Sequence, residues 1–170
     1  CNRCTQLVKK YNLQEKILNQ PIADKSGTWS MRYYQELAVT KSIEAITSGQ
    51  KRILLNLATG TGKTSIAFQI CWKLFKGRWN VSNSGKRIPR ILFLADRNIL
   101  ADQALNSFNE FAVFDDGALT RITTSEIRKS GLPKAASVFF TIYQTFVSGE
   151  EKPHFGQYSK DFFDLVIIDE

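Results

Sequence analysis

The sequence has no long apolar run and no recognisable leader segment. No apolar stretch approaches the roughly 18 residues that a membrane-spanning helix needs, so no membrane association is expected. No basic segment followed by an apolar one opens the chain, so no signal peptide is expected either. The 170 residues are about one domain in length, with 43% hydrophobic and 23% charged. These values are typical of a folded globular protein rather than a disordered one.

Cysteine and histidine are scarce. The cysteines are Cys1, Cys4 and Cys71, and His154 is the single histidine. Three cysteines do not make a disulfide framework, and free thiols suit a reducing cytoplasm. The Cys1-x-x-Cys4 pair supplies half of a zinc site, and a four-ligand site would need Cys71 and His154 to converge on it. Free thiols are the expected state, with zinc binding as the alternative.

Acidic residues are missing from a long central stretch, with no Asp or Glu between Glu44 and Asp96. The net charge is +7. Residues 53–95 hold seven basic and no acidic side chains, whereas residues 96–170 hold seven basic and twelve acidic ones. This distribution favours a polyanionic ligand, either nucleotide phosphates or a nucleic-acid backbone. A solvated surface of helices and loops would give the same composition and stays open as the alternative.

Short apolar runs alternate with helical patterns along most of the chain. The pattern predicts strands at residues 53–57, 91–95, 118–123, 137–142 and 165–169. It predicts helices at residues 33–48, 63–76 and 99–111. Strands without polar alternation, separated by helices, indicate an α/β fold with a parallel sheet flanked by helices. Residues 1–30 are interpreted as a linker or the tail of a preceding domain, and residues 31–170 as the α/β domain.

The most informative motif is a glycine-rich turn between a predicted strand and a predicted helix, Leu57-Ala58-Thr59-Gly60-Thr61-Gly62-Lys63-Thr64. Glycines let the backbone N–H groups of such a turn point at an anion, and the helix N-terminus adds partial positive charge. The predicted nucleotide-binding residues are Thr59, Gly60, Thr61, Gly62, Lys63 and Thr64. Lys63 would reach the β- and γ-phosphates of ATP, and the Thr64 hydroxyl would bind Mg²⁺. The strict motif has glycine where Leu57 stands, and a chance turn before Lys-Thr is the alternative.

A second motif closes the chain, where an apolar run leads into Asp169 and Glu170. In a P-loop ATPase an acidic side chain at the end of a neighbouring strand binds the metal, and Asp169 suits that role. Glu170 is then placed to orient and deprotonate the attacking water. The alternative is a strand that becomes acidic simply where it reaches solvent. Because a fold does not normally end on its catalytic base, we expect the chain to be a piece of a longer protein.

Several segments together resemble the superfamily 2 helicases and translocases. Residues 57–64 resemble their motif I, and residues 168–170 resemble the start of their motif II. Arg32-Tyr33-Tyr34-Gln35 occupies the place of the adenine-recognising glutamine motif. Residues 93–104 and 141–145 resemble motifs Ia and Ic of one family, the restriction (motor) subunit of type I restriction–modification enzymes.

This resemblance implies the first RecA-like, P-loop NTPase lobe of an ATP-dependent DNA translocase. It implies that Gln35 hydrogen-bonds the adenine through its amide, which can donate and accept together, and that Arg32 flanks the base. It implies catalytic roles for Lys63, Asp169 and Glu170, and Mg²⁺ binding by Thr64 and Asp169. For Gln35, a solvent-facing residue on an amphipathic helix is the alternative.

The same resemblance implies contacts with the DNA backbone by Arg97, Thr141, Gln144 and Thr145. Contacts of this kind position a protein on DNA without reading its sequence. For Arg97 the alternative is an ion pair with Asp96 or Asp102 at a helix N-terminus. For the polar residues at 141–145 the alternative is a helix cap.

The implied protein is the R subunit of a type I restriction endonuclease, which hydrolyses ATP with Mg²⁺ and translocates double-stranded DNA. Its implied partners are specificity and methyltransferase subunits, and its implied location is the cytoplasm of a prokaryote. The second motor lobe, with its arginine finger, lies outside these residues, so they are expected to bind ATP weakly and hydrolyse it poorly. The alternatives are another superfamily 2 DNA or RNA helicase, of repair or remodelling type, and a P-loop NTPase without a nucleic-acid partner. A scaffold protein derived from an inactive ATPase would be expected to lose Lys63 or Asp169, and both are present.

Overall fold

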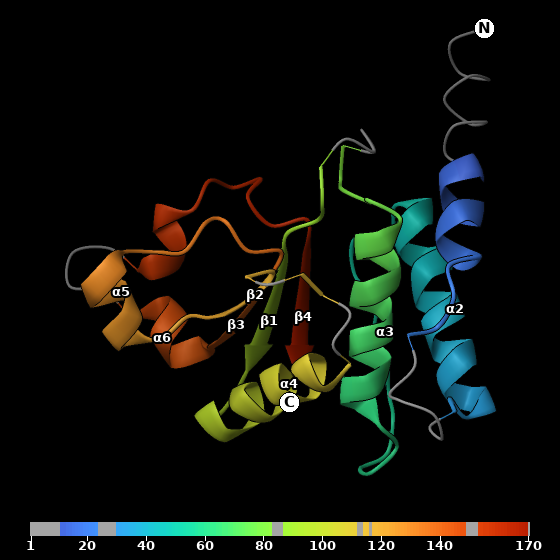
Figure 1. Ribbon diagram of the computed structural model, residues 1–170, viewed down its shortest axis with the longest axis horizontal. Coiled ribbons are helices and arrows are strands. Elements are labelled where there is room, and N and C mark those ends of the chain that lie inside the picture. Colours follow the sequence, from blue (N-terminus) through green and yellow to red (C-terminus); the bar gives the residue numbers. More distant parts are fainter. Residues whose placement is uncertain are drawn as a thin grey trace, which may run out of the picture. The chain divides into compact units, whose positions relative to one another are not determined.

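The computed structural model describes residues 11–23, 30–82, 87–111, 114–115, 117–148 and 153–169 (Figure 1). The chain divides into two compact units, Cys1–Ile88 and Pro89–Glu170. Three residues singled out by the sequence, Cys1, Cys4 and Glu170, lie outside the described residues.

Two helices of the first unit match their predicted bounds, with α2 at Tyr33–Ser48 and α3 at Lys63–Lys76. α2 begins with a capping arrangement in which the Gln35 side chain accepts a hydrogen bond from the Arg32 N–H. It ends at Gly49, whose φ of 93° is readily adopted by glycine. α3 is buried along most of its length because its apolar side chains occupy nearly every face. α2 packs against α3.

Residues 11–23, of which 11–18 are helical, are anchored to α3. The Gln69 side chain accepts a hydrogen bond from the Ala23 N–H (3.0 Å) and donates one to its carbonyl (2.7 Å). The ammonium group of Lys73 donates to the carbonyls of Leu18 and Gln20. Burial lowers the pKa of Lys73. This segment packs as part of the first unit, and the assignment of residues 1–30 to a linker or a preceding domain stays a prediction.

The strand predicted at residues 53–57 is wrong. These residues form no strand, and Leu54 is 91% exposed. A strand exists through hydrogen bonds to a neighbouring strand, and within the described part of the chain none pairs with residues 53–57. The apolar run therefore indicated the composition of a strand but could not show its partner.

The second unit is built on a four-stranded parallel sheet in the order β2-β3-β1-β4 (Figure 1). The strands are β1 (Ile91–Ala95), β2 (Leu119–Arg121), β3 (Val138–Ile142) and β4 (Leu165–Asp169). The connections contain α4 (Asn98–Glu110), α5 (Thr124–Ser130), α6 (Tyr143–Val147) and the 3-10 helix η1 (His154–Gln157). The predicted parallel sheet is confirmed. None of the described helices combines the length and the apolar content needed to cross a membrane.

Aromatic side chains fill both faces of this sheet. On one face Phe108 of α4 packs edge-on against Phe140 of β3, with ring centroids 5.1 Å apart. On the other face Phe139 packs against Phe162 and Phe163, with centroids 5.8 and 5.4 Å apart. Successive side chains of a strand point to opposite faces. Because both faces are covered, β1 and β3 are buried at every position. This core holds the ends of the strands, and with them the polar loops that follow.

Candidate functional site

The glycine-rich turn at residues 57–64 has the backbone of an anion-binding loop. Gly60 and Gly62 have φ angles of 77° and 82°, in the left-handed region that favours glycine. Gly62 is the N-cap of α3, so the turn leads directly into the unpaired N–H groups and positive dipole end of that helix. The first turn of α3 contains no acidic residue. Lys63 and Thr64 are half-buried in that turn.

The glutamine motif lies against this loop. The Gln35 side-chain nitrogen donates to the Thr61 carbonyl at 2.8 Å, and the Tyr34 hydroxyl donates to the same oxygen at 3.2 Å. The Arg32 N–H holds the Gln35 side-chain oxygen at 2.9 Å, and the Arg32 guanidinium lies 3.4 Å from the Tyr34 hydroxyl. Within the loop, the Thr61 hydroxyl donates to the Ala58 carbonyl at 2.6 Å. The structure therefore brings together two segments about 26 residues apart that the sequence had marked separately.

Asp169 stands at the carboxyl end of β4, where it is half-buried and beside Ala95 in the ladder. This is the edge at which parallel α/β sheets bind their ligands. No three His, Cys, Asp or Glu side chains of the described residues gather into a metal-binding cluster. The catalytic role of Glu170 falls outside the described residues and stays a prediction.

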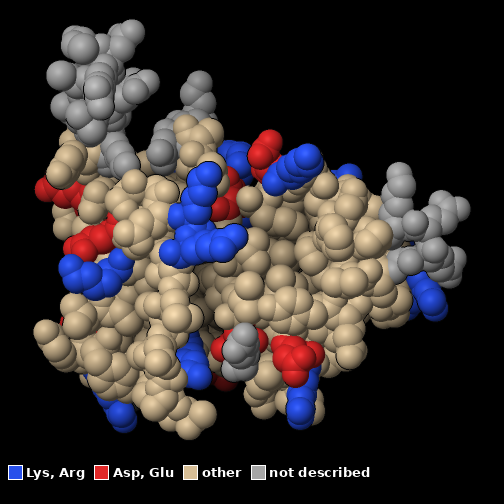
Figure 2. All heavy atoms as spheres, turned by 180° about the vertical axis from the view of Figure 1, so that it is seen from behind, with Lys and Arg blue, Asp and Glu red and all other residues tan. Residues whose placement is uncertain are grey.

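Arg97 follows β1 at the same edge and is the N-cap residue of α4. Its side chain is 79% exposed and lies 3.6 Å from the carboxylate of Asp96, which is 71% exposed. Such an exposed pair contributes little to stability, so the guanidinium can exchange this partner for a phosphate at small cost. Figure 2 shows Lys and Arg side chains reaching the surface on the face it draws, some of them beside Asp or Glu.

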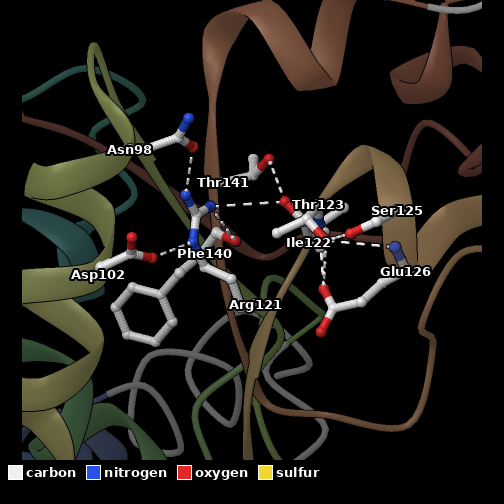
Figure 3. Close-up of polar contacts among 9 residues, drawn as sticks. All are labelled: Asn98, Asp102, Arg121, Ile122, Thr123, Ser125, Glu126, Phe140 and Thr141. Carbon is white, nitrogen blue, oxygen red and sulfur yellow. Dashed lines mark hydrogen bonds and ion pairs between the residues drawn. The ribbon is translucent and has the colours of Figure 1, made fainter.

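The four residues proposed to contact DNA are not equally accessible. Gln144 is exposed at the start of α6, as Arg97 is at the start of α4. Thr141 is fully buried, and its hydroxyl donates to the Ile122 carbonyl at 3.1 Å (Figure 3). Thr145 is 8% exposed. The structure therefore does not bring the Thr141 and Thr145 side chains to the surface.

Arg121 is a structural residue that the sequence prediction missed. Its side chain is 10% exposed and pairs with Asp102 at 2.8 Å. It also donates to the Asn98 side chain at 2.8 Å and to the Phe140 carbonyl at 3.1 Å (Figure 3). Arg121 thereby ties β2 and β3 to the first turns of α4. The sequence did contain a sign of this role, because Arg121 lies within a strand predicted to be buried, and a buried charged side chain requires partners.

The zinc alternative gains no support from the described residues. Cys71 is fully buried in α3, and burial raises the pKa of its thiol well above the usual range. A buried thiol of this kind is inert and packs as a small apolar side chain. His154 lies in η1, where its ring is 3.3 Å from the Gln157 amide.

Comparison with known proteins identifies relatives. Residues 28–170 match the family model described as "Type III restriction enzyme, res subunit". The endonuclease subunit of the Escherichia coli type I restriction enzyme EcoAI is 43% identical over 158 residues, which are 92% of this chain and 18% of that subunit. The endonuclease subunit of EcoKI, from E. coli strain K12, is 38% identical over 117 residues, 68% of this chain and 9% of that subunit. The chain thus spans under a fifth of the length of these relatives.

Solved structures agree with this relationship. A fragment structure described as an HsdR subunit of a type I restriction enzyme from Vibrio vulnificus YJ016 has a TM-score of 0.70 and 36% identity, covering 94% of this chain and 25% of that one. The UvsW helicase of bacteriophage T4 has a TM-score of 0.59 and 16% identity, and the match covers 94% of this chain and 59% of that one. At this identity the likeness shows the fold alone. The predicted RecA-like fold is therefore confirmed. The chain belongs to the type III restriction enzyme res-subunit family, and its homologues include the endonuclease subunits of type I restriction enzymes.

Proposed function

We propose that this chain is the ATP-binding lobe of an ATP-dependent DNA translocase within the R subunit of a type I restriction enzyme. The observation that carries the proposal is the glycine turn at the N-terminus of α3, with Lys63 and Thr64 in the first helical turn and no acidic residue there. This arrangement suits a polyphosphate, because the unpaired N–H groups and positive dipole end of a helix lie beside a lysine in its first turn.

ATP with Mg²⁺ is the proposed ligand. Lys63 would bind the β- and γ-phosphates, and Thr64 and Asp169 would hold the metal. The donor set fits, since a hydroxyl and a carboxylate are the hard oxygen ligands that Mg²⁺ prefers. When bound, the metal would neutralise charge on the phosphates. Glu170 would orient the attacking water and accept its proton.

Adenine recognition is proposed for Gln35, with Arg32 beside the base. The amide of Gln35 uses one N–H on the Thr61 carbonyl and one lone pair on the Arg32 N–H. A glutamine amide has a second N–H and a second lone pair, which are the groups needed to pair with an adenine edge. Gln35 can therefore contact the loop and the base together.

DNA binding is proposed for the carboxyl edge of the second unit, through the exposed Arg97 and Gln144. A guanidinium and an amide suit backbone oxygens, so these contacts would position duplex DNA without reading its sequence. The longer protein would act in the cytoplasm of a prokaryote with specificity and methyltransferase subunits. The resemblance assigns Thr141 and Thr145 to the same DNA surface, and that assignment would require a rearrangement of β3 and α6.

The test has two stages. For the 170-residue chain, calorimetric titration with MgATP should show binding that Lys63→Ala weakens about tenfold or more, as expected for loss of a charged contact. Lys76→Ala removes an exposed ammonium group from the last turn of the same helix and should leave binding unchanged. For the full-length protein, duplex DNA should stimulate ATP hydrolysis. Absence of MgATP binding, or stimulation by RNA alone, would contradict the proposal.

A further inference from the structure

The carbonyl of Thr61 is the acceptor for two side chains from the beginning of α2. The Tyr34 hydroxyl lies 3.2 Å from this oxygen and the Gln35 amide nitrogen 2.8 Å from it. Tyr34 and Thr61 are 27 residues apart in sequence, so the contact joins separate segments of the first unit. Tyr34 is not among the site residues expected from the sequence.

We propose that Tyr34 is a positioning residue for the phosphate loop, which fixes the Thr61–Gly62 peptide in the orientation that a polyphosphate requires. The inference rests on the proposed binding of ATP and adds a residue that acts on the phosphates rather than on the base. Tyr34 touches the loop backbone and not the ligand.

The planarity of the peptide bond provides the mechanism. In a trans peptide the carbonyl and the N–H of one unit point in opposite directions. Donors that hold the Thr61 carbonyl on one side of the loop therefore aim the Gly62 N–H to the other side. Gly62 has φ of 82° and precedes the first turn of α3, so its N–H belongs to the group of amides that face an anion.

A peptide flanked by glycine needs such a restraint. Glycine allows many combinations of φ and ψ, so the Thr61–Gly62 peptide can rotate more freely than an ordinary one. A peptide that rotates presents its carbonyl to the phosphates for part of the time, which weakens anion binding. The two donors reduce that freedom before the ligand arrives, and preorganisation of this kind raises affinity.

The donors are themselves held in place. The Arg32 guanidinium lies 3.4 Å from the Tyr34 hydroxyl oxygen, and the Arg32 N–H binds the Gln35 side-chain oxygen at 2.9 Å. Arg32, Tyr34 and Gln35 thus form a connected hydrogen-bond network that ends on one carbonyl. A cation beside the phenol makes its O–H a stronger donor.

The experiment compares two ligands that share phosphates and differ in the base. The full 170-residue chain is titrated calorimetrically with MgATP and with magnesium tripolyphosphate, which has no adenine. Tyr34→Phe removes the hydroxyl and keeps the ring. Tyr11→Phe is the matched control, because it makes the same change in a side chain that is 72% exposed and lies outside the glutamine motif. Thermal unfolding of both variants shows whether the fold is preserved.

We expect Tyr34→Phe to weaken both ligands by the same factor, about three- to tenfold, as loss of one hydrogen bond implies. Tyr11→Phe should change neither affinity. Gln35→Leu serves as a second variant and should weaken MgATP more than tripolyphosphate, because Gln35 is proposed to contact the base as well.

Three outcomes would overturn the inference. If Tyr34→Phe weakens MgATP alone, the phenol acts on the base. If it changes neither ligand while the wild-type chain binds both, the inference fails and the proposed function stands. If the wild-type chain binds neither ligand, the proposed function fails and the inference fails with it.

Discussion

The side-chain nitrogen of Gln35 lies 2.5 Å from the position that a Cβ atom on Gly62 would occupy. The glutamine motif and the phosphate loop are therefore in such close contact that a Cβ atom at this point would have to displace the Gln35 amide. The φ of Gly62 (82°) requires glycine independently of that contact. Gly60 has a similar φ of 77°, but nothing lies within 4 Å of the position that its Cβ atom would occupy. Comparing substitutions at the two glycines therefore distinguishes the effect of backbone strain, which both share, from the effect of the Gln35 contact, which only Gly62 has.

Gly62→Ala should impair the protein more than Gly60→Ala. Both variants place alanine in the left-handed region at a cost of about 1–2 kcal/mol in the free energy of unfolding. Gly62→Ala must also displace Gln35, so it should lower stability further and weaken MgATP binding beyond the effect of Gly60→Ala. Urea unfolding and calorimetric titration measure the two effects. Adding Gln35→Ala to Gly62→Ala should recover part of the additional loss of stability, and equal stabilities of the two glycine variants would contradict the contact.

Helices whose ends are marked by local sequence patterns were predicted correctly, whereas some features that depend on pairing between distant segments were not. α2 and α3 were predicted to the residue because periodic apolar side chains and terminal glycines mark helix ends. The apolar run at 53–57 could not be resolved in the same way, since a strand depends on a partner that its own composition does not reveal. Some of the functional geometry has the same non-local origin. The hydrogen bonds from Tyr34 and Gln35 to Thr61 follow from packing of α2 beside the loop, which no local pattern encodes.

The burial of Thr141 has a related cause. The resemblance assigned the Thr141 hydroxyl to the DNA backbone, although the strand predicted at residues 137–142 already included Thr141, and β3 ends at Ile142 as predicted. Because both faces of the sheet are covered and β3 is buried at every position, a hydroxyl within this strand is buried whichever face it lies on. Arg97 and Gln144 are beyond the ends of their strands and remain accessible.

Thr141→Val should therefore lower stability and leave DNA binding unchanged. The substitution keeps the shape of the side chain and removes the hydrogen bond to the Ile122 carbonyl. The free energy of unfolding should fall by about 1 kcal/mol. Thr120→Val makes the same change on β2, where no hydrogen bond of the Thr120 side chain to other described residues would be lost. A fall in DNA affinity without a change in urea unfolding would instead identify Thr141 as a DNA contact.

Arg97→Gln should weaken DNA binding in a manner that depends on salt, if the proposed DNA surface is correct. Loss of one phosphate contact reduces the slope of log affinity against log salt concentration by about one unit. The affinity should fall to a similar extent for duplexes of different sequence, since a phosphate contact carries no base information. Fluorescence anisotropy of the full-length protein over a range of salt concentrations measures both quantities.

Arg128→Gln is the matched control for this measurement. Arg128 is exposed in the last turn of α5, which leads away from the carboxyl edge of the sheet. The control should keep the wild-type salt slope. Equal slopes for Arg97→Gln and the wild-type protein would remove Arg97 from the DNA surface.

The anchoring of residues 11–23 by Lys73 should appear as a dependence of stability on alkaline pH. Burial lowers the pKa of Lys73 below its ordinary value of 10.5. Between the lowered value and 10.5 the unfolded chain binds more protons than the folded chain, so the free energy of unfolding rises with pH in that window. Lys73→Met removes this dependence of stability on pH, together with the hydrogen bonds to the Leu18 and Gln20 carbonyls. The test is urea unfolding of both proteins at a series of pH values from neutral towards 10.5. The free energy of unfolding of the wild-type chain should increase relative to that of Lys73→Met. Parallel curves of stability against pH would show that the ammonium group is not held in a desolvated site.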